Sequence, residues 1–69
     1  MMETNVSDNI VENAAIQYQD YSGEWNTCEL LGRSSMFEVL NTMKSVQSRF
    51  NGKRVRCIEH DTGRLVDIL

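Results

Sequence analysis

The stretch SSMFEVLNTMKSVQSRFNG, residues 34–52, decides the fold because it carries the signals of one complete amphipathic helix. Ser35 and Glu38 form a capping-box pattern, in which each side chain accepts a hydrogen bond from a backbone N–H at the start of a helix. Gly52 supplies the stop signal, because glycine adopts the left-handed conformation after a helix at no steric cost. The sequence therefore predicts one helix from Ser35 to Phe50.

Apolar residues recur within this stretch at steps of three and four, which places them on one face of a helix. This apolar stripe consists of Met36, Val39, Leu40, Met43, Val46 and Phe50. Polar side chains fall largely on the opposite side. A helix with one apolar stripe needs a second layer to cover it, and the rest of the chain reads as strands that supply this layer.

Four segments have the features of strands, and they form two hairpins on either side of the helix. The predicted strands are residues 14–21, 25–31, 53–60 and 64–69. Ser22-Gly23 supplies the turn of the first hairpin, and Asp61-Thr62-Gly63 supplies the turn of the second. Gly32-Arg33 then leads the chain from the second strand into the helix.

The alternation of side chains predicts which strand residues face the helix. It is imperfect in residues 25–31, where a bulge near Asn26–Cys28 would reconcile the two faces. In the third strand, Val55 and Cys57 point one way, and Arg54, Arg56 and Ile58 point the other. In the last strand, Val66 and Ile68 are the predicted inward residues.

The predicted fold class is α+β, with the order β-β-α-β-β and an antiparallel-rich four-stranded sheet that carries one helix on one face. Residues 14–69 form a single domain. Residues 1–13 are acidic, lack periodicity and are expected to be a flexible arm. One helix cannot cover both faces of such a sheet, so Trp25 and one of the tyrosines are candidates for the uncovered face.

The chain of 69 residues bounds the function as well as the fold. A domain of this size buries only a small core, so an exposed binding face is easier to build than a deep substrate pocket. We identify no apolar run long enough to span a membrane and no signal peptide. We therefore expect a cytoplasmic protein with no membrane association.

Charge is distributed unevenly along the chain, whose net charge is −3. Residues 1–43 carry seven carboxylates and Arg33 as their one basic residue, whereas residues 44–69 carry six basic residues and three carboxylates. The basic residues that could form a phosphate-binding patch are Lys44, Arg49, Lys53, Arg54 and Arg56. An aromatic stacking motif and a reading helix are both lacking, so nucleic-acid binding is the alternative function rather than the first.

The cysteines and the single histidine suggest no metal site, cofactor or disulfide. Cys28 and Cys57 fall in different predicted strands and are expected to be reduced, buried and apolar in character. A disulfide would suit a secreted domain with more cysteines. A zinc site would need Cys28, Cys57 and His60 to converge with a carboxylate, and the paired CxxC pattern is missing.

Two motifs that resemble catalytic signatures have simpler explanations, and we expect no enzymatic activity. Asp61-Thr62-Gly63 matches the active-site triplet of aspartic proteases, but it also suits a hairpin turn. His60 lacks a neighbouring nucleophile, because Cys57 would point to the opposite face of the strand. Gly52-Lys53 is not a phosphate loop, since position 47, which needs glycine, is glutamine.

Residues 15–69 resemble small uncharacterised proteins of bacteriophages and prophages. The shared pattern is Ile-Gln-Tyr-Gln followed by Gly-Glu-Trp, a helix that opens with Ser-Ser, and Gly-Lys-Arg-Val-Arg followed by Asp-Thr-Gly-Arg-Leu-Val-Asp. The resemblance implies a protein that binds a host or phage macromolecule, in some cases as an inhibitor. It carries over no catalytic residue.

These observations predict a small non-enzymatic protein-interaction module. The expected partner-binding residues are Tyr18, Tyr21 and Trp25, because aromatic side chains on an uncovered sheet face are typical contact points for a protein partner. Self-association to a homodimer is one way to use that face.

Overall fold

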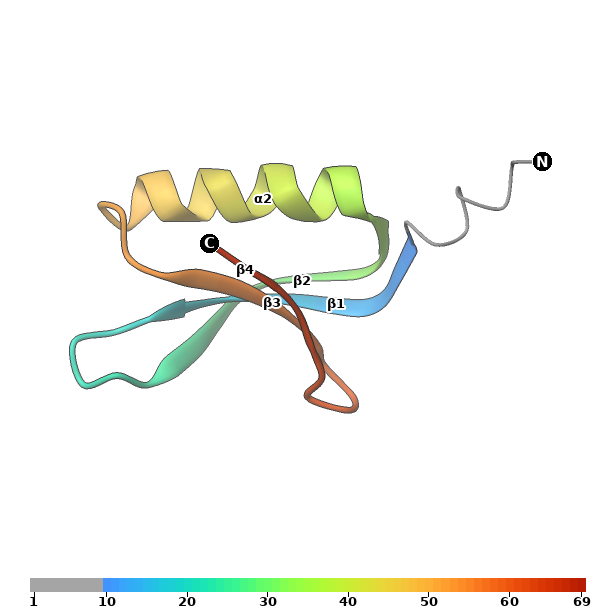
Figure 1. The fold of residues 1–69 in the computed structure, drawn as a ribbon, viewed down its shortest axis with the longest axis horizontal. Helices are drawn as coiled ribbons and strands as arrows, with labels where there is room; N and C mark the ends of the chain where they lie inside the picture. Colours follow the sequence, from blue (N-terminus) through green and yellow to red (C-terminus); the bar gives the residue numbers. More distant parts are fainter. Residues whose placement is uncertain (1–9) are drawn as a thin grey trace.

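The structure of the protein is a computed structural model that describes residues 10–69. Over these residues the chain has the predicted α+β fold, with one helix and a sheet of four antiparallel strands. The elements are β1 (Ile10–Gln19), β2 (Trp25–Ser35), α2 (Met36–Arg49), β3 (Val55–Glu59) and β4 (Leu65–Ile68). The strands lie side by side in the order β2-β1-β3-β4, and α2 lies along one face of the sheet (Figure 1).

Both ends of α2 are capped by side-chain and backbone hydrogen bonds. The Glu38 N–H donates to Ser35 Oγ over 3.2 Å, and the Ser35 N–H donates to Glu38 Oε1 over 3.3 Å, which confirms the capping box. At the other end, Gly52 takes the predicted left-handed conformation with φ of 78°, Asn51 before it is also left-handed with φ of 57°, and the Gly52 N–H donates to the Gln47 carbonyl. Within the described residues, no helix is long and apolar enough to cross a membrane.

The core lies between α2 and the sheet face beneath it. Its fully or almost fully buried members are Val11, Ala14, Ile16, Val39, Met43, Val46, Val55 and Cys57. The remaining residues of the predicted apolar stripe, Met36, Leu40 and Phe50, are partly buried against this cluster. The whole stripe therefore faces the sheet, as its spacing predicts.

β1 starts at Ile10, before the predicted start at Ala14, so the predicted boundary of the flexible arm is wrong for residues 10–13. The physical reason is a bulge. Asn13 has φ of 51°, and this left-handed residue absorbs a register shift, so pairing with β2 continues and Val11 reaches the core. The rest of the predicted arm lies outside the described residues.

β2 is also longer than predicted and runs to Ser35, directly before the helix. Gly32, with φ of 68°, bends the strand at the point where the sequence suggests an end. The predicted bulge is confirmed, because Ile16 pairs with Glu29 while Gln17 pairs with Thr27, which leaves Cys28 as the extra residue.

The prediction that Ile68 points inward is wrong. Cys57 pairs with Asp67 and Ile58 pairs with Leu65, so Val66 is an extra residue in β4. This bulge keeps Val66 partly buried against the core and turns Ile68 to the opposite face, where it pairs with Arg56. A single inserted residue is enough to reverse the facing of the next one.

Candidate functional site

The face of the sheet that points away from α2 is the candidate functional site, and we call it the open face. Residues that pair directly across antiparallel strands project to the same side of a sheet. The pairing therefore builds three rows across the open face. They are Leu30-Ala15-Ile58-Leu65, Thr27-Gln17-Arg56-Ile68, and Trp25-Gln19.

The first row is entirely apolar and crosses all four strands, and we call it the apolar row. Ala15 is fully buried between Leu30 and Ile58, although it does not belong to the core under α2. Leu30 and Leu65, at the two ends, are 65% and 51% exposed. Ile68 in the next row is a further exposed apolar side chain. The open face therefore leaves hydrocarbon in contact with water at both ends of the apolar row and at Ile68.

A shallow hollow adjoins the apolar row at its β2 end. It has a volume of about 140 Å³ and is lined by Leu30 together with Asn13, Ala14, Gly32 and His60. Asn13 connects β1 to the turn of the second hairpin, because its carbonyl accepts from the His60 N–H over 2.8 Å. The hollow is large enough for one apolar side chain of a partner.

The second row is held by a chain of hydrogen bonds that crosses three strands. Gln17 Nε2 donates to Thr27 Oγ1 over 3.0 Å, and Arg56 Nε donates to Gln17 Oε1 over 2.8 Å. The guanidinium carbon of Arg56 lies 4.2 Å from the centre of the Trp25 ring. These contacts place the Arg56 guanidinium over the Trp25 ring on the open face and restrict its orientation.

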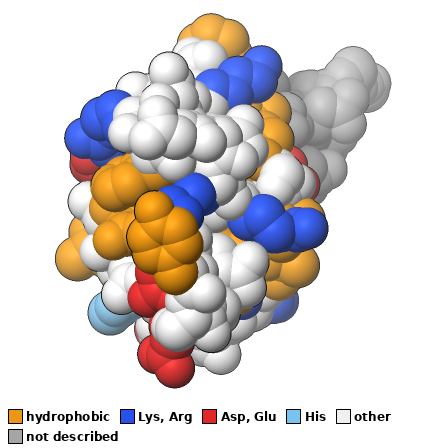
Figure 2. Space-filling model, turned by 90° about the vertical axis from the view of Figure 1, so that its left-hand side faces the viewer, with side chains coloured by type: hydrophobic (Ala, Val, Ile, Leu, Met, Phe, Trp, Pro, Cys, Tyr) orange, Lys and Arg blue, Asp and Glu red, His pale blue; other side chains and the backbone are white. Residues whose placement is uncertain are grey.

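The structure does not bring the three predicted aromatic residues together. Trp25 lies on the open face, whereas Tyr18 lies on the covered face, where its ring stacks on Phe50 with centres 4.1 Å apart. Tyr21 lies in the turn between β1 and β2 and is 97% exposed, with the Lys53 ammonium 3.8 Å from its ring centre. Figure 2, viewed from the end of the molecule that carries the turn between β1 and β2, shows hydrophobic and basic side chains next to one another.

The predicted basic patch is divided in the same way. Arg49, near the end of α2, pairs with Glu29 over 3.3 Å on the covered side of the sheet, and Lys44 is exposed on α2. Arg56 lies on the open face, while Lys53 lies over Tyr21. Arg54 is exposed just before β3.

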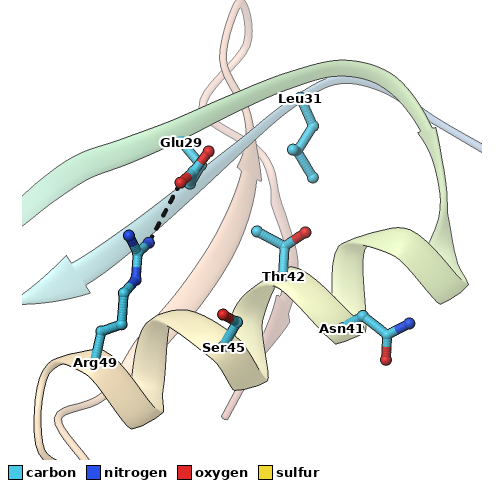
Figure 3. Close-up of a pocket in the computed structure, with 6 residues that line it drawn as sticks. All are labelled: Glu29, Leu31, Asn41, Thr42, Ser45 and Arg49. Atoms are coloured by element: carbon cyan, nitrogen blue, oxygen red, sulfur yellow. Dashed lines mark hydrogen bonds and ion pairs between the residues drawn. The ribbon is translucent and has the colours of Figure 1, made fainter.

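A groove on the covered side is the larger depression, with a volume of about 390 Å³. It runs between α2 and β2 and is lined by Glu29, Leu31, Asn41, Thr42, Ser45 and Arg49 (Figure 3). The two charged residues of the groove, Arg49 and Glu29, form an ion pair with each other, and most of the other lining groups are hydroxyls and an amide. These groups include no nucleophile paired with a base, so the groove does not suggest catalysis.

The polar side chains of the turn between β3 and β4 form hydrogen bonds with one another and stabilise the turn. Glu59 accepts from the Arg64 guanidinium over 2.8 and 3.0 Å and from the Thr62 hydroxyl over 2.9 Å, and these bonds, that of Arg64 first, lower the pKa of Glu59 from 4.5 to about 2. Asp61 accepts from the Asn13 amide. The Asp61-Thr62-Gly63 triplet is therefore engaged in turn contacts.

The two cysteines lie on β2 and β3, which flank β1 on opposite sides. Two strand spacings separate their backbones by about 10 Å, which exceeds the roughly 7 Å that a disulfide tolerates. Burial raises the pKa of both the Cys28 and the Cys57 thiols, which disfavours a reactive thiolate. Within residues 10–69, no three His, Cys, Asp or Glu side chains are grouped so that they could hold a metal ion.

Gln17, Leu30 and Leu65 were not predicted as residues of the site. One signal was available, because alternation places Ile58 on the same strand face as Arg56, and an apolar residue on a polar strand face marks a surface that needs cover. The chain was compared with models of protein families, with curated proteins and with solved structures, and no match was found. The resemblance to phage proteins stays a prediction.

Proposed function

We propose that this protein is a non-enzymatic interaction module that binds a protein partner through the open face. The observation that supports this most is the apolar row, because its end residues Leu30 and Leu65 remain exposed in a domain that has little hydrocarbon to spare. Contiguous apolar side chains that are exposed on the surface of a small domain often mark a protein–protein interaction site. Covering the row would remove this hydrocarbon from water at about 25 cal/mol per Å².

The partner is a host or phage protein, or a second copy of this chain. Because residues 15–69 resemble phage proteins, we propose that the protein derives from a phage or mobile element. We also propose that binding inhibits the partner. Trp25 supports this proposal more than Tyr18 and Tyr21 do, because it alone of the three lies on the open face, where it contacts Arg56.

Nucleic-acid binding is the alternative, and it has less support. Its five candidate residues lie on different sides of the molecule, and Arg49 is paired with Glu29. Phosphate binding depends on cations that converge on one backbone path.

An affinity pull-down from host lysate tests the proposal, with nuclease-treated and untreated samples. The bait variants are Leu65→Ser on the open face and Phe37→Ser as a matched control, because Phe37 is 74% exposed on α2. We expect a protein that survives nuclease treatment, is retained by Phe37→Ser and is lost with Leu65→Ser. Light scattering of the purified protein tests self-association with the same variants. If the captured material disappears with nuclease and the protein is monomeric, the proposal is wrong.

A further inference from the structure

We infer that Arg56 and Trp25 form a subsite on the open face for a carboxylate of an acidic segment of the partner. The inference rests on the proposed function, because it specifies the chemistry of the partner that covers the apolar row. The subsite consists of Arg56, its support Gln17, and the Trp25 ring beneath it.

Arg56 is oriented so that part of its guanidinium is already used and part is available. Its Nε donates to Gln17, and within the described part of the chain its two terminal amino groups have no hydrogen-bond partner. Gln17 is itself fixed by its bond to Thr27. A guanidinium held by stacking and by one bond loses little entropy when it forms a two-pronged bond to a carboxylate.

The position of Arg56 makes an anion a requirement for any partner that covers the apolar row. Arg56 lies two residues before Ile58 on β3, in the neighbouring row, so a protein surface that buries Ile58 also withdraws water from the guanidinium. Arg56 is the one charged residue in the three rows of the described sheet, and the rows themselves offer no carboxylate to pair with it. A buried and unpaired charge is strongly unfavourable, so the partner must bring the counter-charge.

The same geometry favours a protein carboxylate over a nucleic-acid phosphate. Phosphate recognition along a strand gains from several cations and from bases stacked on open aromatic rings. Here one face of the Trp25 ring is already covered by Arg56, and the row on the other side of the Arg56 row is hydrocarbon. A segment that presents one acidic residue beside apolar side chains matches the row that contains Arg56 and the apolar row next to it.

A displayed library of random peptides, selected for binding to the full chain, tests the subsite even though the partner is unidentified. We expect the selected peptides to contain an Asp or Glu beside apolar residues. Their affinity should fall roughly 10- to 100-fold with Arg56→Gln, since a hydrogen bond to a charged group contributes about 1.5–3 kcal/mol. Arg56→Lys should recover only part of that loss. Lys44→Gln is the control with the same charge change away from the open face, because Lys44 is exposed on α2.

Trp25 gives a direct readout, because it is the single tryptophan of the chain. We expect its fluorescence to change when a selected peptide binds, and not when the Asp or Glu of that peptide is replaced by its amide. Far-UV circular dichroism of each variant verifies that the fold is kept.

The outcomes separate the subsite from the proposed function. Peptides that lack acidic residues, bind Arg56→Gln normally and are lost with Leu65→Ser would overturn the subsite and leave the proposed function intact. If no peptide is selected, or if binding is insensitive to Leu65→Ser, both fail. If single-stranded oligothymidine binds, is weakened by Arg56→Gln and no peptide does so, the ligand is a nucleic acid and the inference is wrong.

Discussion

The two faces of this sheet are made by the same strands, and two consecutive residues of β1 show how they differ. Ile16 points toward α2 and is fully buried within the core. Gln17 points to the open face, where it accepts from Arg56 and donates to Thr27. The covered face is held together by apolar packing, whereas the open face fixes its polar side chains with hydrogen bonds and leaves apolar ones in water. The two faces of one sheet therefore differ in how their side chains are held, and we propose that the open face serves recognition.

The largest expected effect concerns the covered face. Met43→Ala removes a fully buried side chain of α2 and should lower the free energy of unfolding by about 2–5 kcal/mol, because a cavity adds to the lost burial. Phe37→Ala, on the exposed side of the same helix, should change it by less than about 0.5 kcal/mol. Urea denaturation followed by circular dichroism measures both. Equal effects would mean that α2 packs on the sheet with a different face.

A smaller effect is expected from the start of α2, the element that makes the two faces different. Ser35→Ala removes the hydroxyl that accepts from the Glu38 N–H and should cost about 1 kcal/mol. Ser48→Ala is the matched control within the helix, where alanine is the better helix former and should stabilise slightly. A Ser35→Ala protein as stable as the parent in urea would show that the cap contributes nothing.

Acid should weaken the first hairpin through Asp20, in its turn. Hydrogen bonds from the Ser22 hydroxyl and then the Asn26 amide lower the pKa of Asp20 from 3.8 to about 2. A carboxylate whose folded pKa is lowered contributes stability that is complete above about pH 4 and is lost as the pH falls toward 2. We expect unfolding curves recorded between pH 5 and about pH 2 to show this loss. The free energy of unfolding should depend less on pH in Ser22→Ala, because this variant keeps the Asp20 carboxylate but removes the hydroxyl that donates to it.

The smallest effect on stability is expected on the open face, where the effect on binding is expected to be the largest. Leu30→Ala should change the free energy of unfolding by less than about 0.5 kcal/mol, because the side chain is mostly exposed. The same substitution should weaken capture of the partner. A loss of stability as large as that of Met43→Ala would remove the distinction between the two faces.

The helix side of the covered face could be predicted almost completely from the sequence. The step of three and four in the helix fixes which residues face the sheet, and the capping box fixes where the helix starts. These are local signals, and each depends on residues within one or two turns of one another. The structure confirms them in Val39, Met43 and Val46.

The open face could not be predicted to the same extent, because strand faces depend on register. The extra residue Val66 in β4 places Ile68 on the open face. The left-handed Asn13 allows β1 to extend toward the N-terminus as far as Ile10. Neither bulge has a clear signal in the alternation of the sequence. The pairing of Arg56 with Gln17 joins residues far apart in the chain, so it too required the sheet order.

The position of β1 in the sheet has a consequence for how the chain folds. β1 precedes the other described strands in sequence but lies in the middle, and its ladder with β3 joins residues 14–18 to residues 55–59. Each hairpin closes between neighbours in the chain, whereas this ladder closes a loop of about 40 residues and carries the larger entropy cost of closure. Contacts between distant residues slow folding. We therefore expect the two hairpins to form early and the β1–β3 ladder to set the folding rate.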